Sequence, residues 1–180
     1  TGRVQIVVLD KTGTITMGEP KVTDLHPARG VTEAELLTCA AALEAKSEHP
    51  LAKAVMARAE GMTLPDVTDF RALPGNGLSA LLAGKALQGG NLAYISGFTT
   101  VDQSTRDQAE ALAAQGKTPL YFAKDGRLLG VIAVADAIKE ESPQAIRELK
   151  KMGIRVVMLT GDNRRTAVAI GKLAGVSEVI

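Results

Sequence analysis

The chain has 180 residues, of which 46% are hydrophobic and only 3% aromatic, so aliphatic side chains must fill its core. Its 21 lysines and arginines balance 20 aspartates and glutamates, which gives no reason to expect a nucleic acid or an anionic membrane as partner. The single cysteine, Cys39, cannot form an internal disulfide and lies in an apolar run typical of a buried residue. No stretch approaches the ~18 apolar residues of a membrane span, so we expect a soluble chain of one or two domains.

The first half of the chain is predicted to contain a buried strand, two helices and several antiparallel strands. Residues 5–9 (QIVVL) form a short apolar run typical of a buried strand. A helix is expected over 31–47, where Thr32 opens a Thr-x-x-Glu capping box, and a second helix should have Pro50 in its first turn. Residues 67–90 hold apolar pieces divided by Pro-Gly, Asn-Gly and Gly-Gly, which favour antiparallel strands and turns.

The second half begins with a helix over 104–116 and continues at 118–136 as two strands joined by an Asp-Gly turn. A helix then starts at Ser142, its expected N-cap, and is followed by a strand at 154–159 and a helix at 164–174. This alternation of strands and helices predicts a parallel sheet with crossover helices.

These two patterns divide the chain into two predicted domains. Residues 1–18 and 126–180 would form an α/β core with a parallel sheet, built from both ends of the chain. Residues 19–125 would form an inserted α+β domain that contains an antiparallel sheet.

Two polar motifs follow strands of the predicted core. Asp10, followed by KTGT, ends the first strand, and the sequence TGDN at 160–163 ends the strand at 154–159. Ligands of an open parallel sheet bind beyond the carboxyl ends of its strands, so the two motifs should converge there. An aspartate in this position can attack a phosphorus or carbon centre. TGDN on its own is as typical of a turn and helix cap, made by Asp162 or Asn163, as of a functional motif.

Several residues next to Asp10 and Asp162 suit a phosphate group. They offer hydroxyls, backbone amides or positive charge, and they are Lys11, Thr12, Thr14, Thr160 and Gly161. A helix N-terminus after Asn163 would add free N–H groups. Two aspartates close to a phosphate would need Mg²⁺ to offset their repulsion.

DKTGT resembles the phosphorylation motif of P-type ATPases, and TGDN resembles their second motif. The resemblance implies a haloacid dehalogenase-like phosphorylation domain, with the insertion as nucleotide-binding domain. Asp10 would then accept the γ-phosphate of ATP, the Thr12 carbonyl would help Asp10 to hold Mg²⁺, and Thr14 and residues 160–162 would contact the phosphate. Related phosphatases carry a second aspartate where Thr12 stands, which implies slow hydrolysis of the acyl phosphate here.

Ser-Glu-His-Pro at 47–50 resembles the signature of heavy-metal-transporting P-type ATPases. By this resemblance His49 packs against the adenine ring, and Glu44 accepts a hydrogen bond from its amino group. Three further residues match positions near the nucleotide: Gly75, Gly77 and Asn91. Taken singly, such residues are also typical of turns and helix starts. DAIKEES at 136–142 resembles the pattern of the copper(I)-exporting subgroup.

The sequence therefore predicts the ATP-binding and phosphorylation region of a heavy-metal pump, with copper(I) as the expected ion, on the cytoplasmic side of a membrane. The implied partners are ATP, Mg²⁺, and the membrane helices and actuator domain of the same pump, but no nucleic acid. The family's Gly-Asp-Gly-x-Asn-Asp motif does not occur before Ile180, so we expect a piece of a longer protein with little turnover of its own. Two alternatives stay open: a stand-alone phosphohydrolase of the same superfamily, and a nucleotide-sensing module without activity.

Overall fold

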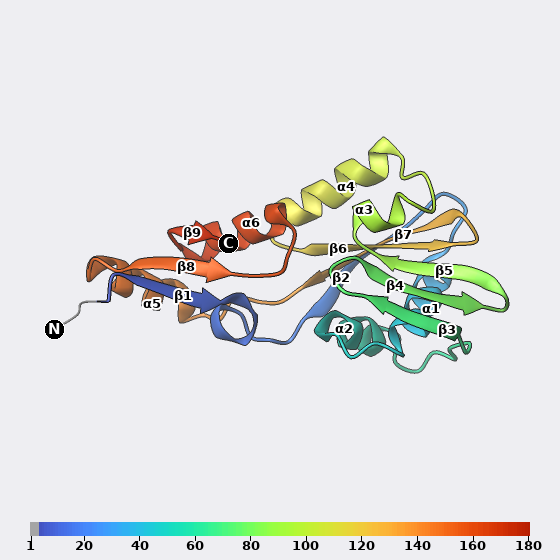
Figure 1. Ribbon diagram of the computed structural model, residues 1–180, viewed down its shortest axis with the longest axis horizontal. Helices are drawn as coiled ribbons and strands as arrows, with labels where there is room; N and C mark the ends of the chain where they lie inside the picture. The colour runs from blue at the N-terminus through green and yellow to red at the C-terminus, as the bar shows by residue number, and fades with distance from the viewer. Residues whose placement is uncertain (1–3) are drawn as a thin grey trace.

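The computed structural model describes residues 4–180, which form two units side by side along the long axis of the molecule (Figure 1). The smaller unit holds a parallel sheet in the order β1-β8-β9, made of β1 (Ile6–Asp10), β8 (Arg155–Leu159) and β9 (Glu178–Val179). The larger unit holds a six-stranded antiparallel sheet. A parallel core with an antiparallel insertion, as predicted, is confirmed.

The parallel sheet is covered on one face by α5 (Ser142–Lys151) and α6 (Arg164–Ala174). Leu9, Val156 and Met158 form this face and pack with both helices. The opposite face of β1 is open, because Ile6 is 54% exposed and Val8 53% exposed. The prediction of a buried first strand is therefore wrong: among the described residues β1 is an edge strand of this sheet, and α5 and α6 cover one face of the sheet.

Ser142 does not cap α5, contrary to prediction. Glu141 occupies the N-cap position without a side-chain hydrogen bond, and the Ser142 hydroxyl donates instead to the Ile15 carbonyl at 2.9 Å. A buried hydroxyl must find a partner, and here the partner is a carbonyl of another segment that also accepts from the Lys139 amide.

The larger sheet has the order β2-β7-β6-β5-β4-β3. Its strands are β2 (Lys21–Pro27), β3 (Thr68–Leu73), β4 (Gly77–Leu82), β5 (Lys85–Gly90), β6 (Thr118–Lys124) and β7 (Arg127–Ala135). Its helices are α1 (Glu33–Glu44), α2 (Pro50–Arg58), α3 (Leu92–Ile95) and α4 (Gln103–Ala114). The capping box that predicted the start of α1 is present, since the Thr32 hydroxyl accepts from the Glu35 amide at 3.1 Å.

Helices cover both faces of the larger sheet. Neighbouring residues of β6 show this, because Phe122 packs with the α1 and α2 side and Tyr121 with the α3 and α4 side. The two clusters of apolar side chains are the cores that stabilise this unit.

The position of β7 moves the predicted boundary of the insertion. β7 pairs with both β2 and β6, so a division at residue 126 would split the β6–β7 hairpin between two units. We therefore propose that the insertion runs to Ala135, with residues 136–141 as its second connection to the core. Across residues 4–180, no helix combines the length and apolar composition that crossing a membrane requires.

Candidate functional site

The two motifs of the core lie at one edge of the parallel sheet. Asp10 is the last residue of β1 and pairs in register with Leu159, the last residue of β8. Thr160 follows directly, so the side chains of DKTGT and TGDN start from adjacent strand ends. The two motifs meet because parallel strands bring their carboxyl ends to the same edge of the sheet.

Lys11 and Asp162 join these motifs by an ion pair. The Lys11 ammonium lies 2.5 Å from the Asp162 carboxylate, and the two side chains are only 12% and 13% exposed. The second oxygen of Asp162 accepts from the Thr118 hydroxyl at 3.5 Å, and the Asp162 amide donates to the Thr160 hydroxyl at 3.1 Å. Lys11 was predicted to offset the charge of a phosphate; in this structure it offsets that of Asp162.

Three of the remaining predicted phosphate contacts face solvent. Residues 11–15 form one irregular turn, closed by a bond of 2.9 Å from the Thr16 amide to the Lys11 carbonyl. Gly13 has a φ of +78°, a backbone conformation that glycine adopts readily. Thr12 and Thr14 in this turn, like Gly161 across the sheet edge, are exposed. An anion arriving from solution therefore has free access to these groups.

Helix α6 begins at the same edge. Asn163 is its N-cap: the Asn163 Oδ1 accepts from the Thr166 amide at 3.0 Å and its Nδ2 donates to the Thr166 hydroxyl at 2.8 Å. The sequence left open whether Asp162 or Asn163 caps this helix, and in the structure the cap is Asn163. The positive end of the α6 dipole lies directly after Asp162, which favours negative charge nearby.

Oxygen donors suited to Mg²⁺ are present in small number. The Asp10 carboxylate is exposed, and the Thr12 carbonyl lies in the same turn. Within residues 4–180, no three histidine, cysteine, aspartate or glutamate side chains gather as a metal site. Protein-bound Mg²⁺ commonly has one or two carboxylates and completes its shell with water and substrate phosphates, so this donor set fits an ion that arrives with a nucleotide.

A second group of predicted residues surrounds the turn between β3 and β4. Asn91 binds this turn, because its Nδ2 donates to the Gly75 carbonyl at 3.0 Å while its Oδ1 accepts from the Tyr94 amide at 2.8 Å. Gly77 allows a close approach: a Cβ built there would lie 2.2 Å from the Gly89 carbonyl oxygen and 2.7 Å from Tyr94. The structure therefore brings Gly75, Gly77 and Asn91 together.

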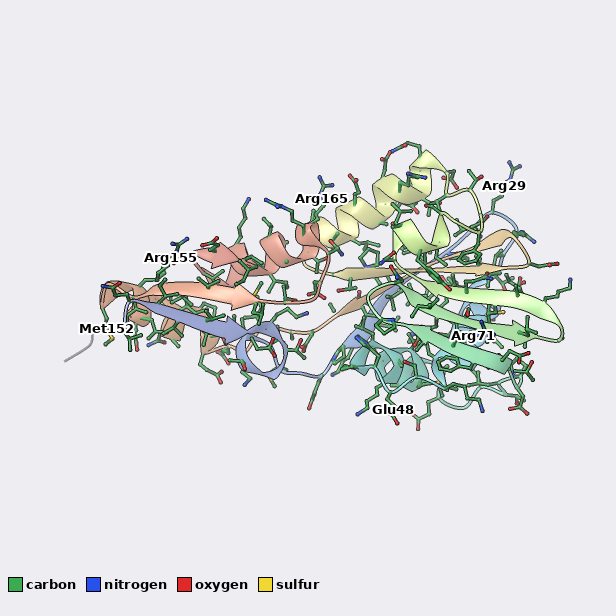
Figure 2. All side chains as sticks on the ribbon, viewed as in Figure 1. Arg29, Glu48, Arg71, Met152, Arg155 and Arg165 are labelled. Carbon is green, nitrogen blue, oxygen red and sulfur yellow. The ribbon has the colours of Figure 1, made fainter. Side chains whose placement is uncertain are left out.

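Glu44 and His49 lie at the junction of α1 and α2. Glu44 is 7% exposed, and burial raises the pKa of its carboxyl to about 7. His49 is exposed and caps α2, with its Nδ1 accepting from the Leu51 amide at 3.2 Å. This bond leaves the Nε2 edge of the ring available for other contacts. Figure 2 labels the adjacent Glu48 near α2.

The α1–α2 junction approaches the glycine turn through the sheet. A Cβ at Gly89, on β5, would lie 3.0 Å from Leu43, the neighbour of Glu44. Gly89 is followed by Gly90, which pairs with Gly77. Among residues 4–180, however, no hydrogen bond or ion pair joins Glu44 or His49 to this turn.

Three side chains next to the site were not predicted from the sequence as functional. Asp136, Lys139 and Ser142 each bind an atom of residues 13–19. The sequence DAIKEES that contains them predicts a subgroup pattern and a helix cap at Ser142, but bonds to backbone atoms leave no motif of their own.

Contacts between the two units lie close to the candidate site. The Thr166 hydroxyl donates to the Lys117 carbonyl at 2.6 Å, and Arg165 lies 2.6 Å from Glu110 of α4. Figure 2 shows Arg165 where α6 meets α4. The insertion is thereby held against the start of α6.

Comparisons with known proteins agree with this arrangement. The family described as haloacid dehalogenase-like hydrolase matches residues 4–180. Copper-transporting ATPase 1 of Rhizobium meliloti is 46% identical over 177 residues, covering 97% of this chain and 21% of that protein. The copper-exporting P-type ATPase of Bacillus subtilis is 42% identical over 182 residues, covering 100% of this chain and 23% of that protein. The chain thus spans about a fifth of the length of these relatives.

Solved structures match the same fold. A zinc-transporting PIB-type ATPase in the E2.Pi state superposes with a TM-score of 0.69 at 36% identity, covering 98% of this chain and 29% of that one. The N-domain of HMA8, a copper-transporting P-type ATPase, superposes with a TM-score of 0.56 at 30% identity, covering 64% of this chain and 99% of that one. The chain therefore belongs to the haloacid dehalogenase-like hydrolase family, and its strong relatives are P-type ATPases.

Proposed function

We propose that this chain is the ATP-binding and phosphorylation region of a heavy-metal-transporting P-type ATPase, with copper(I) as the transported ion. The observation that carries the proposal is the shared sheet edge where Asp10 lies beside the Lys11–Asp162 ion pair. Relatives named as copper-transporting ATPases support the choice of ion. In this proposal the region lies on the cytoplasmic side of a membrane and drives the membrane helices of the same pump.

Asp10 is the proposed acceptor of the phosphoryl group. One oxygen of its carboxylate attacks the γ-phosphorus of ATP, the bond from this phosphorus to the bridging oxygen breaks, and ADP leaves with the electron pair. The exposed position of Asp10 at the strand end gives the nucleotide access. Thr12 offers no carboxylate in the turn to activate water, so the acyl phosphate would persist after its formation.

The groups around Asp10 are suited to bind and orient the phosphate. The Thr14 and Thr160 hydroxyls, the Gly161 amide and the start of α6 all lie at this edge. Lys11 is within the same turn, and an incoming phosphate would compete with Asp162 for its ammonium group. Asp10 and the Thr12 carbonyl would hold Mg²⁺, which when bound neutralises phosphate charge.

The insertion supplies the proposed nucleotide site. His49 would stack on the adenine ring, Glu44 would accept from the adenine amino group, and the turn of Gly75 and Gly77, held by Asn91, would leave room for the nucleotide. The match to the N-domain of HMA8 supports the assignment of nucleotide binding to the insertion.

A calorimetric titration with ATP tests the proposal through His49. We expect His49→Ala to weaken binding by roughly 1–2 kcal/mol, the range of a stack between a base and an aromatic ring. Because His49 also caps α2, His49→Asn is the matched variant: asparagine preserves a helix cap but removes the ring. Both variants should lose the same affinity.

The second histidine, His26 on β2, provides the control, and His26→Ala should bind ATP like the parent. If His49→Asn binds as tightly as the parent, the adenine assignment is wrong. If no ATP binds but a small phosphate ester is hydrolysed, the chain is instead a phosphohydrolase of the same superfamily.

A further inference from the structure

Residues 136–142, which we name the clamp segment, run alongside the turn that follows Asp10. The Met17 amide donates to the Ala137 carbonyl at 2.8 Å, and the Lys139 amide donates to the Ile15 carbonyl at 3.0 Å. Thr16 and Ile138 form an antiparallel bridge between these two bonds. The clamp segment therefore fixes the end of the turn by its backbone alone.

The Asp136 side chain hydrogen-bonds to residues 16–19, where the chain first passes from the core to the insertion. Its carboxylate accepts from the Thr16 hydroxyl at 2.5 Å, from the Gly18 amide at 3.2 Å and from the Glu19 amide at 3.1 Å. Since Asp136 directly follows β7, it ties the two connections of the insertion to each other. The end of the turn after Asp10 is thus attached to both connections of the insertion.

The Lys139 side chain binds the tip of the turn that follows Asp10. Its ammonium group donates to the Gly13 carbonyl at 2.8 Å, at the exposed tip of the turn. A peptide group is planar and trans, so its C=O and N–H point in opposite directions. By holding the Gly13 carbonyl, Lys139 also sets the direction of the Thr14 N–H, which then points away from the lysine.

This bond does little for the fold itself. Ile15 and Thr16 are already fixed by the backbone of the clamp segment and by Ser142, whose hydroxyl donates to the Ile15 carbonyl. The side chain of Lys139 instead orders an exposed, glycine-containing tip, and it gives up rotamer freedom to do so. The residue that gains a fixed orientation is Thr14, one of the candidate phosphate contacts.

We propose that Lys139 is a positioning residue for phosphoryl transfer: it orients the Gly13–Thr14 peptide so that the Thr14 N–H is directed at the phosphate. The inference rests on the proposed function, because it assigns a role within the same site. Lys139 acts through the Thr14 amide and needs no contact with the phosphate itself. Asp136 holds the end of the same turn to both connections of the insertion.

The test is a two-dimensional ¹⁵N–¹H NMR titration of the chain with inorganic phosphate in the presence of Mg²⁺. We expect the Thr14 amide signal of the parent to shift on titration. In Lys139→Met the apparent phosphate affinity should fall by roughly fivefold, the equivalent of one hydrogen bond. Lys139→Arg, which keeps a cationic donor, should restore the shift of the Thr14 signal.

Lys150→Met is the matched control, since Lys150 donates in the same way to a glycine carbonyl, that of Gly175, but away from the turn. It should leave the Thr14 titration unchanged. An unresponsive Thr14 amide in the parent, or equal titrations in the parent and Lys139→Met, would overturn the inference. A Thr14 response without any ATP binding by calorimetry would instead count against the proposed nucleotide site alone.

Discussion

Replacing Gly77 by alanine should destabilise the insertion by about 3 kcal/mol or more and abolish ATP binding. The added Cβ would lie 2.2 Å from the Gly89 carbonyl oxygen and 2.9 Å from the Gly90 Cα, both of them backbone atoms. They cannot move aside without breaking the β4–β5 pairing, where Gly77 lies opposite Gly90. Denaturant unfolding measures the loss of stability, and calorimetry measures the loss of affinity.

Gly75→Ala provides the comparison within the same turn. A Cβ at Gly75 meets no atom within 4 Å, but its φ of +76° is unfavourable for alanine. We therefore expect a cost of only about 1–2 kcal/mol, with ATP still bound. Equal losses for the two variants would show that close packing at Gly77 is not what the turn requires.

The stability of the chain should fall as pH rises from about 4.5 to about 7, because of Glu44. Burial raises the pKa of this carboxyl from its ordinary value of 4.5 to about 7 in the folded protein. Between these values the folded protein keeps a proton that the unfolded chain has lost, so raising the pH favours unfolding. The difference in pKa corresponds to roughly 3 kcal/mol of unfolding free energy.

Glu44→Gln should remove this pH dependence and stabilise the chain at pH 8 relative to the parent. The exposed Glu48, four residues further along, supplies the control, and Glu48→Gln should keep the slope of the parent. Denaturant unfolding at several pH values measures both. A parent whose stability is flat between pH 5 and 7.5, or a Glu44→Gln variant with the same slope as the parent, would show that Glu44 ionises normally.

Local signals in the sequence predicted most of the fold. The capping box at Thr32, the Pro50 helix start and the turn sequences between residues 67 and 90 each correspond to an element boundary in the structure. The predicted boundary at residue 125 places β7 in the core, because a strand buried almost throughout is also typical of a parallel sheet. Its pairing with β6 has a local signal, the Asp-Gly turn, but its pairing with β2, about a hundred residues earlier in the chain, has none.

The candidate site was predictable where it depends on strand ends. Asp10 and the TGDN motif were expected to meet because parallel strands bring their carboxyl ends to one edge, and the register of β1 and β8 agrees. The partner of Lys11 was not predicted, since the choice between a phosphate and Asp162 depends on side-chain geometry. The bonds of Asp136 and Lys139 were not predicted because most of their partners are backbone atoms. Every residue has backbone atoms, so such bonds leave no pattern of residue types in the sequence.

The most direct measurement is an ATP titration of the ¹⁵N-labelled chain, followed by mapping of the amide signals that shift. If the insertion is a nucleotide-binding unit, the shifts will gather at Glu44, His49, Gly75, Gly77 and Asn91. The structure offers a groove elsewhere for comparison, of about 590 Å³ between α4 and α6, lined in part by Glu110, Tyr121 and Arg164. Asn91 also lines this groove, so a shift at Asn91 alone does not distinguish the two sites. Shifts confined to that groove, or no shifts at millimolar ATP, would contradict the proposed nucleotide site.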